Sequence, residues 1–440
     1  MPLVESLQNM FRVPELKRRI LFTLALFAVY RLGEHVPSPG VDAAALAASF
    51  QQQAGTLFGL YDIFVGGAFS RATIFALGIM PYISASIVLQ VLGAVVPYLE
   101  KLRKEGEEGQ KKINQLTRYG TVLISLIQSY AYGVFLMSNP GGVQVVPHPG
   151  FAFMFTLMVT QTTGTIFVMW LGEQITERGI GNGISLIIFI NIIGSIPNVF
   201  QATVESVRTG ALSLITVAAG ALVSVLMVAF VVVLTQGTRK IPVQYAKRIV
   251  GRRMYGGAST HIPLRVNTAG VIPIIFASSI LILPTTVAQF FPESAIGQWI
   301  QSNFGPHVNG VWEILYALFI IFFTYFYTAV VLNPNDLAEN MRKYGGFIPG
   351  IRPGKKTAEY IDRVMTRITL VGAVCLAIVA IVPDLFFQTF HMPLFRGFGG
   401  TSVLIVVGVA LDTLQQVESH LLMRHYEGFV KKSRIRGRRG

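Results

Sequence analysis

The sequence has little charge and almost no cysteine. Only 13% of its 440 residues are Asp, Glu, Lys or Arg, against about 25% in an average soluble domain. The single cysteine, Cys375, has no second cysteine to pair with, which excludes a disulfide-stapled fold. With 52% hydrophobic residues and a mean hydropathy of +0.56, the composition indicates a polytopic membrane protein.

Long apolar runs are what the sequence has instead. A membrane-spanning helix needs about 20 mostly apolar residues. On this criterion the hydropathy pattern predicts an all-α polytopic fold with ten transmembrane helices. Their predicted ranges are 20–36, 76–98, 119–136, 151–171, 184–200, 211–234, 269–290, 311–332, 368–383 and 401–422.

The charge that is present is strongly one-sided. There are 36 Lys and Arg residues against 22 Asp and Glu, a net charge of +14. With ten alternating spans, 32 of the 36 basic residues lie in the N-terminal segment, the even-numbered loops and the C-terminal tail. The positive-inside rule then predicts that both termini are cytoplasmic.

Two short motifs occur twice, five spans apart. Gly78–Ile83 (GIMPYI) in the second span matches Gly270–Ile275 (GVIPII) in the seventh, and Gly183–Ile188 in the fifth matches Gly400–Ile405 in the tenth. Because five is odd, the matching spans run in opposite directions, which is typical of an inverted-topology duplication. We therefore predict two inverted-repeat halves of five helices, the alternative being chance recurrence of Gly, Pro and Ile in apolar sequence.

This division predicts the organisation of the chain. An apolar segment broken by Gly66, Gly67 and Arg71 precedes the second span and is expected to form a short re-entrant or loosely held helix. The predicted parts are a cytoplasmic N-terminus (1–19), an N-terminal half (20–200), an external hinge loop (201–210), a C-terminal half (211–422) with cytoplasmic loops 235–268 and 333–367, and a basic cytoplasmic tail (423–440).

Catalytic and coupling motifs are scarce. The seven histidines form no HExxH-like pair, and Gly350–Thr357 lacks the glycine and Lys-Ser/Thr positions of a phosphate-binding loop. The few acids in the spans, Glu313, Asp412 and Glu418, lie near helix ends, where they are typical interfacial groups rather than ion-coupling sites. We predict that the protein is not an enzyme and uses no cofactor or metal.

Longer strings carry a family resemblance that runs from about residue 10 to residue 430. They closely resemble bacterial SecY, the channel subunit of the Sec protein translocon. The resemblance implies a ten-helix hourglass that is closed at mid-membrane by an apolar ring and plugged from outside. The strings are Gly66–Ile87 (GGAFSRATIFALGIMPYISASI), Trp170–Ser185 (WLGEQITERGIGNGIS), Arg252–Ser279, Phe347–Gly354 (FIPGIRPG) and Gly399–Val407 (GGTSVLIVV).

The resemblance implies specific ring residues, and the repeat supports them. Ile83 and Ile275 each follow the repeat proline by two positions, and Ile188 and Ile405 each follow the repeat glycine by five. Within a span, residues four apart share one helix face. Taken singly, an isoleucine in a span is usually lipid-facing or packing. The implied ring is Ile79, Ile83, Ile184, Ile188, Ile275 and Ile405.

The broken segment corresponds to the plug of the family, about residues 61–74. Here Gly66 and Gly67 would let it move, Phe64 and Phe69 would pack it under the ring, and Arg71 would anchor it or face water. A narrow apolar ring of this kind blocks ions because it stays dry.

The family also has a lateral gate between the second and third and the seventh and eighth spans. Ser84 and Gln128 match its polar lining, although Gln128 could equally make an ordinary interhelical hydrogen bond.

The cytoplasmic loops carry more basic residues than topology requires. The 235–268 loop has seven basic residues and no acid, which suits RNA phosphate contacts, and the resemblance implies the ribosome, with Arg252 and Arg253 near its exit tunnel. Arg352 matches the position that couples to the motor ATPase SecA. The tail, with Tyr426, could serve either partner or anionic lipid. The alternative is a solvated positive-inside surface.

We therefore predict a protein-conducting channel of the plasma (inner) membrane that passes unfolded polypeptides across and releases membrane segments sideways. The expected partners are SecE-like and SecG-like small subunits, SecA, the ribosome, signal sequences, nascent chains and lipid. A solute transporter of inverted-repeat design is the main alternative. It is disfavoured by the apolar repeat centre and the basic loops, and a purely structural scaffold would not need the glycine-broken segment.

Overall fold

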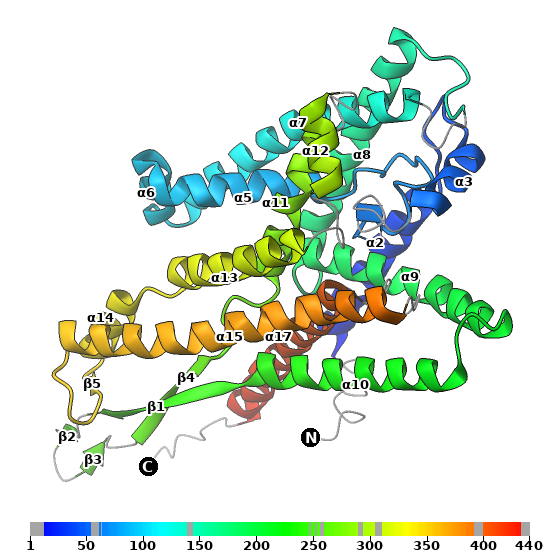
Figure 1. The fold of residues 1–440 in the computed structure, drawn as a ribbon. Coiled ribbons are helices and arrows are strands. Elements are labelled where there is room, and N and C mark those ends of the chain that lie inside the picture. Colours follow the sequence, from blue (N-terminus) through cyan, green and yellow to red (C-terminus); the bar gives the residue numbers. More distant parts are fainter. Residues whose placement is uncertain are drawn as a thin grey trace. The chain divides into compact units, whose positions relative to one another are not determined.

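The structure is a computed structural model, whose helices and strands are drawn in Figure 1. The chain divides into two compact units. Unit 1 comprises Met1–Pro197, Ile282–Gln301 and Val409–Gly440, and unit 2 comprises Asn198–Leu281 and Ser302–Gly408. The residues that the structure describes are 13–53, 61–62, 64–138, 144–245, 248–250, 253–255, 259–288, 294–303, 310–390 and 399–432.

Helices dominate both units, as the apolar runs predict. The chain begins with α2 (Pro14–Gly33), α3 (Ala43–Gln53), α5 (Met80–Val95), α6 (Pro97–Lys104), α7 (Glu107–Met137), α8 (Phe151–Arg178) and α9 (Gly183–Arg208). It continues with α10 (Leu214–Gln236), α11 (Ile272–Ala288), α12 (Ala295–Asn303), α13 (Val311–Val331), α14 (Pro334–Lys343), α15 (Lys355–Phe390) and α17 (Gly400–Lys432).

Each of the ten predicted spans overlaps a helix among the described residues. Seven of the described helices are long and apolar enough to cross a membrane, or eight if the bent pair α5 and α6 is one span. The apolar part of α11, Ile272–Ile282, is shorter than this criterion requires. The protein is therefore a multi-pass membrane protein, and the count of ten spans stays a prediction.

Two predicted boundaries were wrong. The second span begins at Met80 instead of residue 76 and bends by 98° where α5 meets α6. Pro97 explains the bend, because proline forces the preceding residue, Val96, into an extended conformation. The predicted hinge loop 201–210 is helical as far as Arg208, and the helix stops only before Gly210, whose φ is +75°.

The predicted cytoplasmic loops contain a small β-structure, which the all-α assignment did not foresee. β1 (Thr238–Tyr245) pairs antiparallel with β4 (Ser259–Arg265) and with β5 (Gly346–Phe347), while β2 (Arg248–Val250) pairs with β3 (Arg253–Tyr255). Ile241 and Val243 alternate inward from β1 and join a core with α14 and α15. The described parts of the two loops thus form one folded platform.

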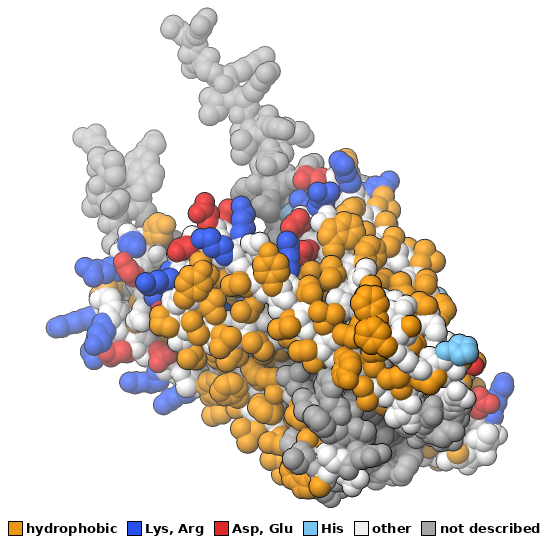
Figure 2. Space-filling view, turned by 90° about the horizontal axis from the view of Figure 1, so that it is seen from above, with side chains coloured by type: hydrophobic (Ala, Val, Ile, Leu, Met, Phe, Trp, Pro, Cys, Tyr) orange, Lys and Arg blue, Asp and Glu red, His pale blue; other side chains and the backbone are white. Residues whose placement is uncertain are grey.

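The surface agrees with a membrane environment. Figure 2 shows hydrophobic side chains over much of the visible face. On α10, which is apolar on all sides, Ile215 is 82% exposed and Val233 is 70% exposed. A helix that is apolar all round would be buried in a soluble protein, so its exposed side chains are matched by lipid.

Candidate channel constriction and plug

The first repeated motif adopts the same local structure in both copies. Gly78 and Gly270 have φ values of +53° and +63°, a region that favours glycine. In the first copy the Ile83 N–H donates to the Ile79 carbonyl at 3.1 Å. In the second, the Ile275 N–H donates to the carbonyl that follows the repeat glycine, at 3.2 Å. Both isoleucines are buried.

The second repeated motif also forms two equivalent helix starts. Gly183 begins α9 and Gly400 begins α17. A Cβ on Gly183 would overlap the carbonyl oxygen of Gly172 in α8, and one on Gly400 would overlap that of Val379 in α15. Glycine lets each helix begin against the backbone of the preceding long helix, and the same close contact in both copies supports the duplication.

Most of the six predicted ring isoleucines are buried. Ile79, Ile83 and Ile188 are buried in unit 1, where Ile184 is only half-buried. Ile275 and Ile405 are buried in unit 2. Burial of these residues fits a constriction, but the closed ring of six stays a prediction.

After helical residues at 61–62 and 64, the plug segment is a series of turns instead of the expected helix. From Val65 to Ile79 the backbone forms successive turns, with Gly66 and Gly67 at φ values of +71° and +81°. Phe64 and Phe69 are buried, and the ring of Phe69 contacts that of Tyr132 at a centroid distance of 4.5 Å. Positive φ values interrupt helical geometry, which explains why an apolar segment of this length does not form a helix.

Three helices of unit 1 hold the plug through its backbone carbonyls. The Asn191 amide of α9 donates to the Phe64 carbonyl at 2.9 Å. The Tyr132 hydroxyl of α7 donates to Phe69, and the Gln161 amide of α8 donates to Thr73, each at 2.8 Å. The turns leave these carbonyls without helical partners, so side chains satisfy them.

The plug also has internal polar contacts. The Arg71 guanidinium donates to the carbonyl of Gly67 at 2.8 Å and to that of Gly66 at 3.0 Å. The Asp62 carboxylate accepts from the Ser70 N–H at 2.8 Å. The Arg71 side chain thus braces the two glycines from within the plug, and its two predicted roles stay predictions.

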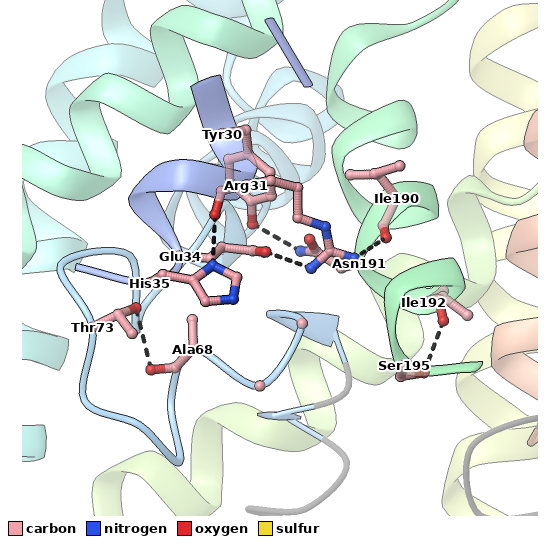
Figure 3. A network of polar contacts seen from close by, with 12 residues as sticks. Tyr30, Arg31, Glu34, His35, Ala68, Thr73, Ile190, Asn191, Ile192 and Ser195 are labelled. Carbon is pink, nitrogen blue, oxygen red and sulfur yellow. Dashed lines mark hydrogen bonds and ion pairs between the residues drawn. The ribbon is translucent and has the colours of Figure 1, made fainter. Parts of the chain in front are cut away.

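A buried polar network lies beside the plug and was missed by the sequence reasoning. Arg31 of α2 forms an ion pair with Glu34 at 2.6 Å and donates to the Ile190 carbonyl at 3.0 Å (Figure 3). Asn191 donates to the Tyr30 hydroxyl at 2.9 Å. The signal was present, since two opposite charges three residues apart interrupt an apolar span. Such charges stay in a membrane protein only when they are paired.

The predicted gate residues both lie in the interior of unit 1. Ser84 on α5 and Gln128 on α7 are buried, and these two helices pack against each other. The Gln128 amide oxygen has no hydrogen-bond partner within the described part of the chain. Both the lateral gate and the alternative of an ordinary interhelical hydrogen bond for Gln128 stay predictions.

The docking residues are only partly described. Arg352 is exposed, and its carbonyl accepts from the Thr357 hydroxyl at 2.9 Å, which fixes the loop before α15. Arg252 lies outside the described residues. Arg253 is in β3 and Tyr426 is in α17, and their side chains are not described. The docking roles remain predictions.

Comparison with known proteins agrees with this architecture. The SecY family model matches residues 73–414. The protein translocase subunit SecY of Escherichia coli (strain K12) is 48% identical over 425 residues, which cover 96% of both chains. That of Haemophilus influenzae is 47% identical over 426 residues and also covers 96% of both chains.

Solved structures share the fold at low sequence identity. A structure described as that of a protein conducting channel has a TM-score of 0.66 and 17% identity, and the match covers 95% of this chain and 97% of that one. Sec61 in the canine ribosome-channel complex from the endoplasmic reticulum has a TM-score of 0.61 and 16% identity, with the same coverage. The family model and the relatives at 47–48% identity show that the chain belongs to the SecY family of protein translocase subunits.

Proposed function

We propose that this chain is the channel through which unfolded polypeptides cross the plasma membrane, and from which hydrophobic segments leave sideways into lipid. The observation that carries the proposal is the duplicated helix start, which gives both copies a buried isoleucine at the same distance from the repeat glycine. We propose that the six predicted ring isoleucines close the pore and that residues 61–74 plug it from outside.

The chemistry of aliphatic side chains suits this task. A narrow apolar constriction excludes water and ions. Aliphatic groups also form no hydrogen bonds with a passing peptide, so chains of any sequence can slide past them. The plug adds a second seal that is held by a few polar bonds and can be displaced.

The platform around β1 is the proposed docking face of the channel. We propose that it lies on the cytoplasmic side of the membrane, where both termini would also lie. Its core is apolar, while Arg239 and Lys240 of β1 are exposed. Sequence-blind contacts to RNA phosphates need such cations, and the structural relatives include ribosome-bound channels. We propose the ribosome and a SecA-type motor ATPase as alternative partners here, and small SecE- and SecG-like subunits within the membrane.

Cross-linking to a translocating chain tests the channel directly. With Cys375→Ser as background, a cysteine at position 83 or 188 should form a disulfide with a cysteine in an arrested secretory polypeptide. A cysteine at Leu123, which is 62% exposed on α7, serves as the lipid-facing control. Cross-links at the control position alone would contradict a polypeptide path along these isoleucines.

Charge reversal at Arg352 separates the two proposed driving partners. Arg352→Glu should abolish motor-driven export and leave ribosome binding largely intact, because its exposed side chain supports no core contact. Export by purified motor in reconstituted vesicles and ribosome co-sedimentation are the two measurements. Survival of both activities would contradict the division of labour between the two loops.

A further inference from the structure

The polar network beside the plug joins two features that the proposed function treats separately. Ile188, a predicted ring residue, and Asn191 are three positions apart on α9 and therefore share one face of the helix. Asn191 is 1% exposed, and its amide group donates to the Phe64 carbonyl and to the Tyr30 hydroxyl, each at 2.9 Å. One side chain thus connects α9 with the plug and with α2.

The backbone of α9 is fixed at the same point. The Arg31 guanidinium donates to the Ile190 carbonyl at 3.0 Å, and its other arm pairs with Glu34, which is fully buried (Figure 3). A helix held here by α2 presents Asn191 to the plug at a defined position. Movement of α9 relative to α2 would therefore change the Asn191 contacts.

One acceptor of this polar network is unsatisfied, which favours release of the plug. The amide oxygen of Asn191 is buried without a hydrogen-bond partner among the described residues. It lies against Gly66, where a Cβ would stand 3.1 Å from it. Burying an unpaired acceptor is unfavourable, and departure of the plug would expose it to water.

We propose that Asn191 is a positioning residue that couples the constriction to the plug. A polypeptide that displaces Ile188 moves α9, withdraws the Asn191 amide from the Phe64 carbonyl and frees the plug. The inference rests on the proposed channel function and adds to it the contact through which a chain in the ring unseats the plug. Gln161 and Tyr132 hold the plug from α8 and α7, which carry none of the predicted ring residues.

The test measures how accessible the plug is in the full chain. With Cys375→Ser as background, Ser70→Cys places a thiol on the half-buried middle of the plug. Its rate of labelling by a water-soluble maleimide is measured in purified translocon, idle or holding an arrested polypeptide. In the parent protein we expect slow labelling when idle and faster labelling with the arrested chain.

Asn191→Leu removes both donated bonds and keeps a side chain branched at Cγ with the same number of heavy atoms. Because it leaves the Phe64 carbonyl without its donor, we expect idle labelling to rise about tenfold, and the arrested chain to add little. Gln161→Leu is the matched control, since Gln161 also donates two bonds, to Thr73 and to Ser38. It should raise idle labelling but preserve the further rise with the arrested chain. Asn191→Ala replaces Asn191→Leu if the latter fails to insert.

A double-mutant comparison separates coupling from simple loosening. Ile188→Ala shortens the side chain that the polypeptide pushes, so it should reduce the chain-induced rise in the parent and in Gln161→Leu. In Asn191→Leu it should change nothing further. The proposal is overturned if idle labelling of Asn191→Leu equals that of the parent, or if Ile188→Ala reduces the rise equally in all backgrounds.

Failure of this proposal is distinguishable from failure of the channel function. Missing cross-links between the arrested chain and positions 83 and 188 would contradict the channel itself. If those cross-links form while Asn191→Leu leaves labelling and its chain dependence unchanged, the channel stands and only the role of Asn191 is wrong.

Discussion

The segments that precede the two copies of the first repeated motif are held in place by different means. The plug, before Gly78, buries apolar side chains such as Phe64 and Phe69, and side chains of three helices also donate to its carbonyls. The platform, whose strand β4 precedes Gly270, is held by an apolar core. The members of that core are Ile241, Val243, Leu264, Met341, Ile348, Ile361 and Met365.

This difference matches what each segment is proposed to do. The hydrogen bonds donated to the plug contribute only about 1 kcal/mol each, so these bonds can be broken and formed again when the plug moves. A core of seven buried side chains, each contributing about 1.5–3 kcal/mol on burial, keeps a docking surface intact while large partners pull on it. The repeated motifs begin helices in the same way in both copies. The plug and the platform, which precede the two copies, are what makes them differ.

The largest expected effect on stability comes from substituting the glycines at the two helix starts of the second repeated motif. Gly183→Ala and Gly400→Ala each place a Cβ on a backbone carbonyl of the preceding long helix. We expect each to lower the free energy of unfolding by about 3 kcal/mol, because backbone must move. Thermal unfolding in detergent is the measurement, and Gly150→Ala, whose Cβ would meet no atom within 4 Å, is the control. Tolerance of one substitution but not the other would break the equivalence of the two copies.

A smaller loss of stability is expected when the platform core is disturbed, and it should leave the plug unchanged. Ile361→Ala removes a 1% exposed side chain from the platform core, at an expected cost of about 2 kcal/mol. Limited proteolysis of the strands β1–β4 should accelerate, while maleimide labelling of Ser70→Cys stays unchanged. Leu370→Ala, on the exposed side of the same helix, should change neither. Faster labelling of the plug would show that the two segments are not independently held.

The sequence predicted the features that depend on local patterns. Apolar runs mark the helices, and the Gly and Pro positions mark the helix starts, because the left-handed backbone at Gly78 and the close approach at Gly183 require glycine there. Boundaries were predicted less well. Helix α9 continues through the expected hinge because residues 201–208 contain no strong helix breaker.

The contacts that hold the plug could not be predicted in the same way. Tyr132, Gln161 and Asn191 are single polar residues on three different helices, and no periodicity connects them. Their partners are backbone carbonyls, which exist at every residue and leave no trace in the sequence. Only the Arg31 and Glu34 charges in the first apolar run indicated that a buried polar site lay nearby.

The smallest expected effect distinguishes the two plug glycines. Both have positive φ values, so replacement by alanine strains the backbone similarly, by about 1 kcal/mol. A Cβ on Gly66 would stand 2.7 Å from the buried Glu34 carboxylate, whereas one on Gly67 would stand 3.1 Å from the movable end of Arg71. Gly66→Ala should therefore increase the ion conductance of idle channels in vesicles more than Gly67→Ala, by the equivalent of about 1 kcal/mol. Equal conductance would mean that backbone conformation at the two glycines decides how the plug is seated, and that the close approach of Gly66 to Glu34 does not.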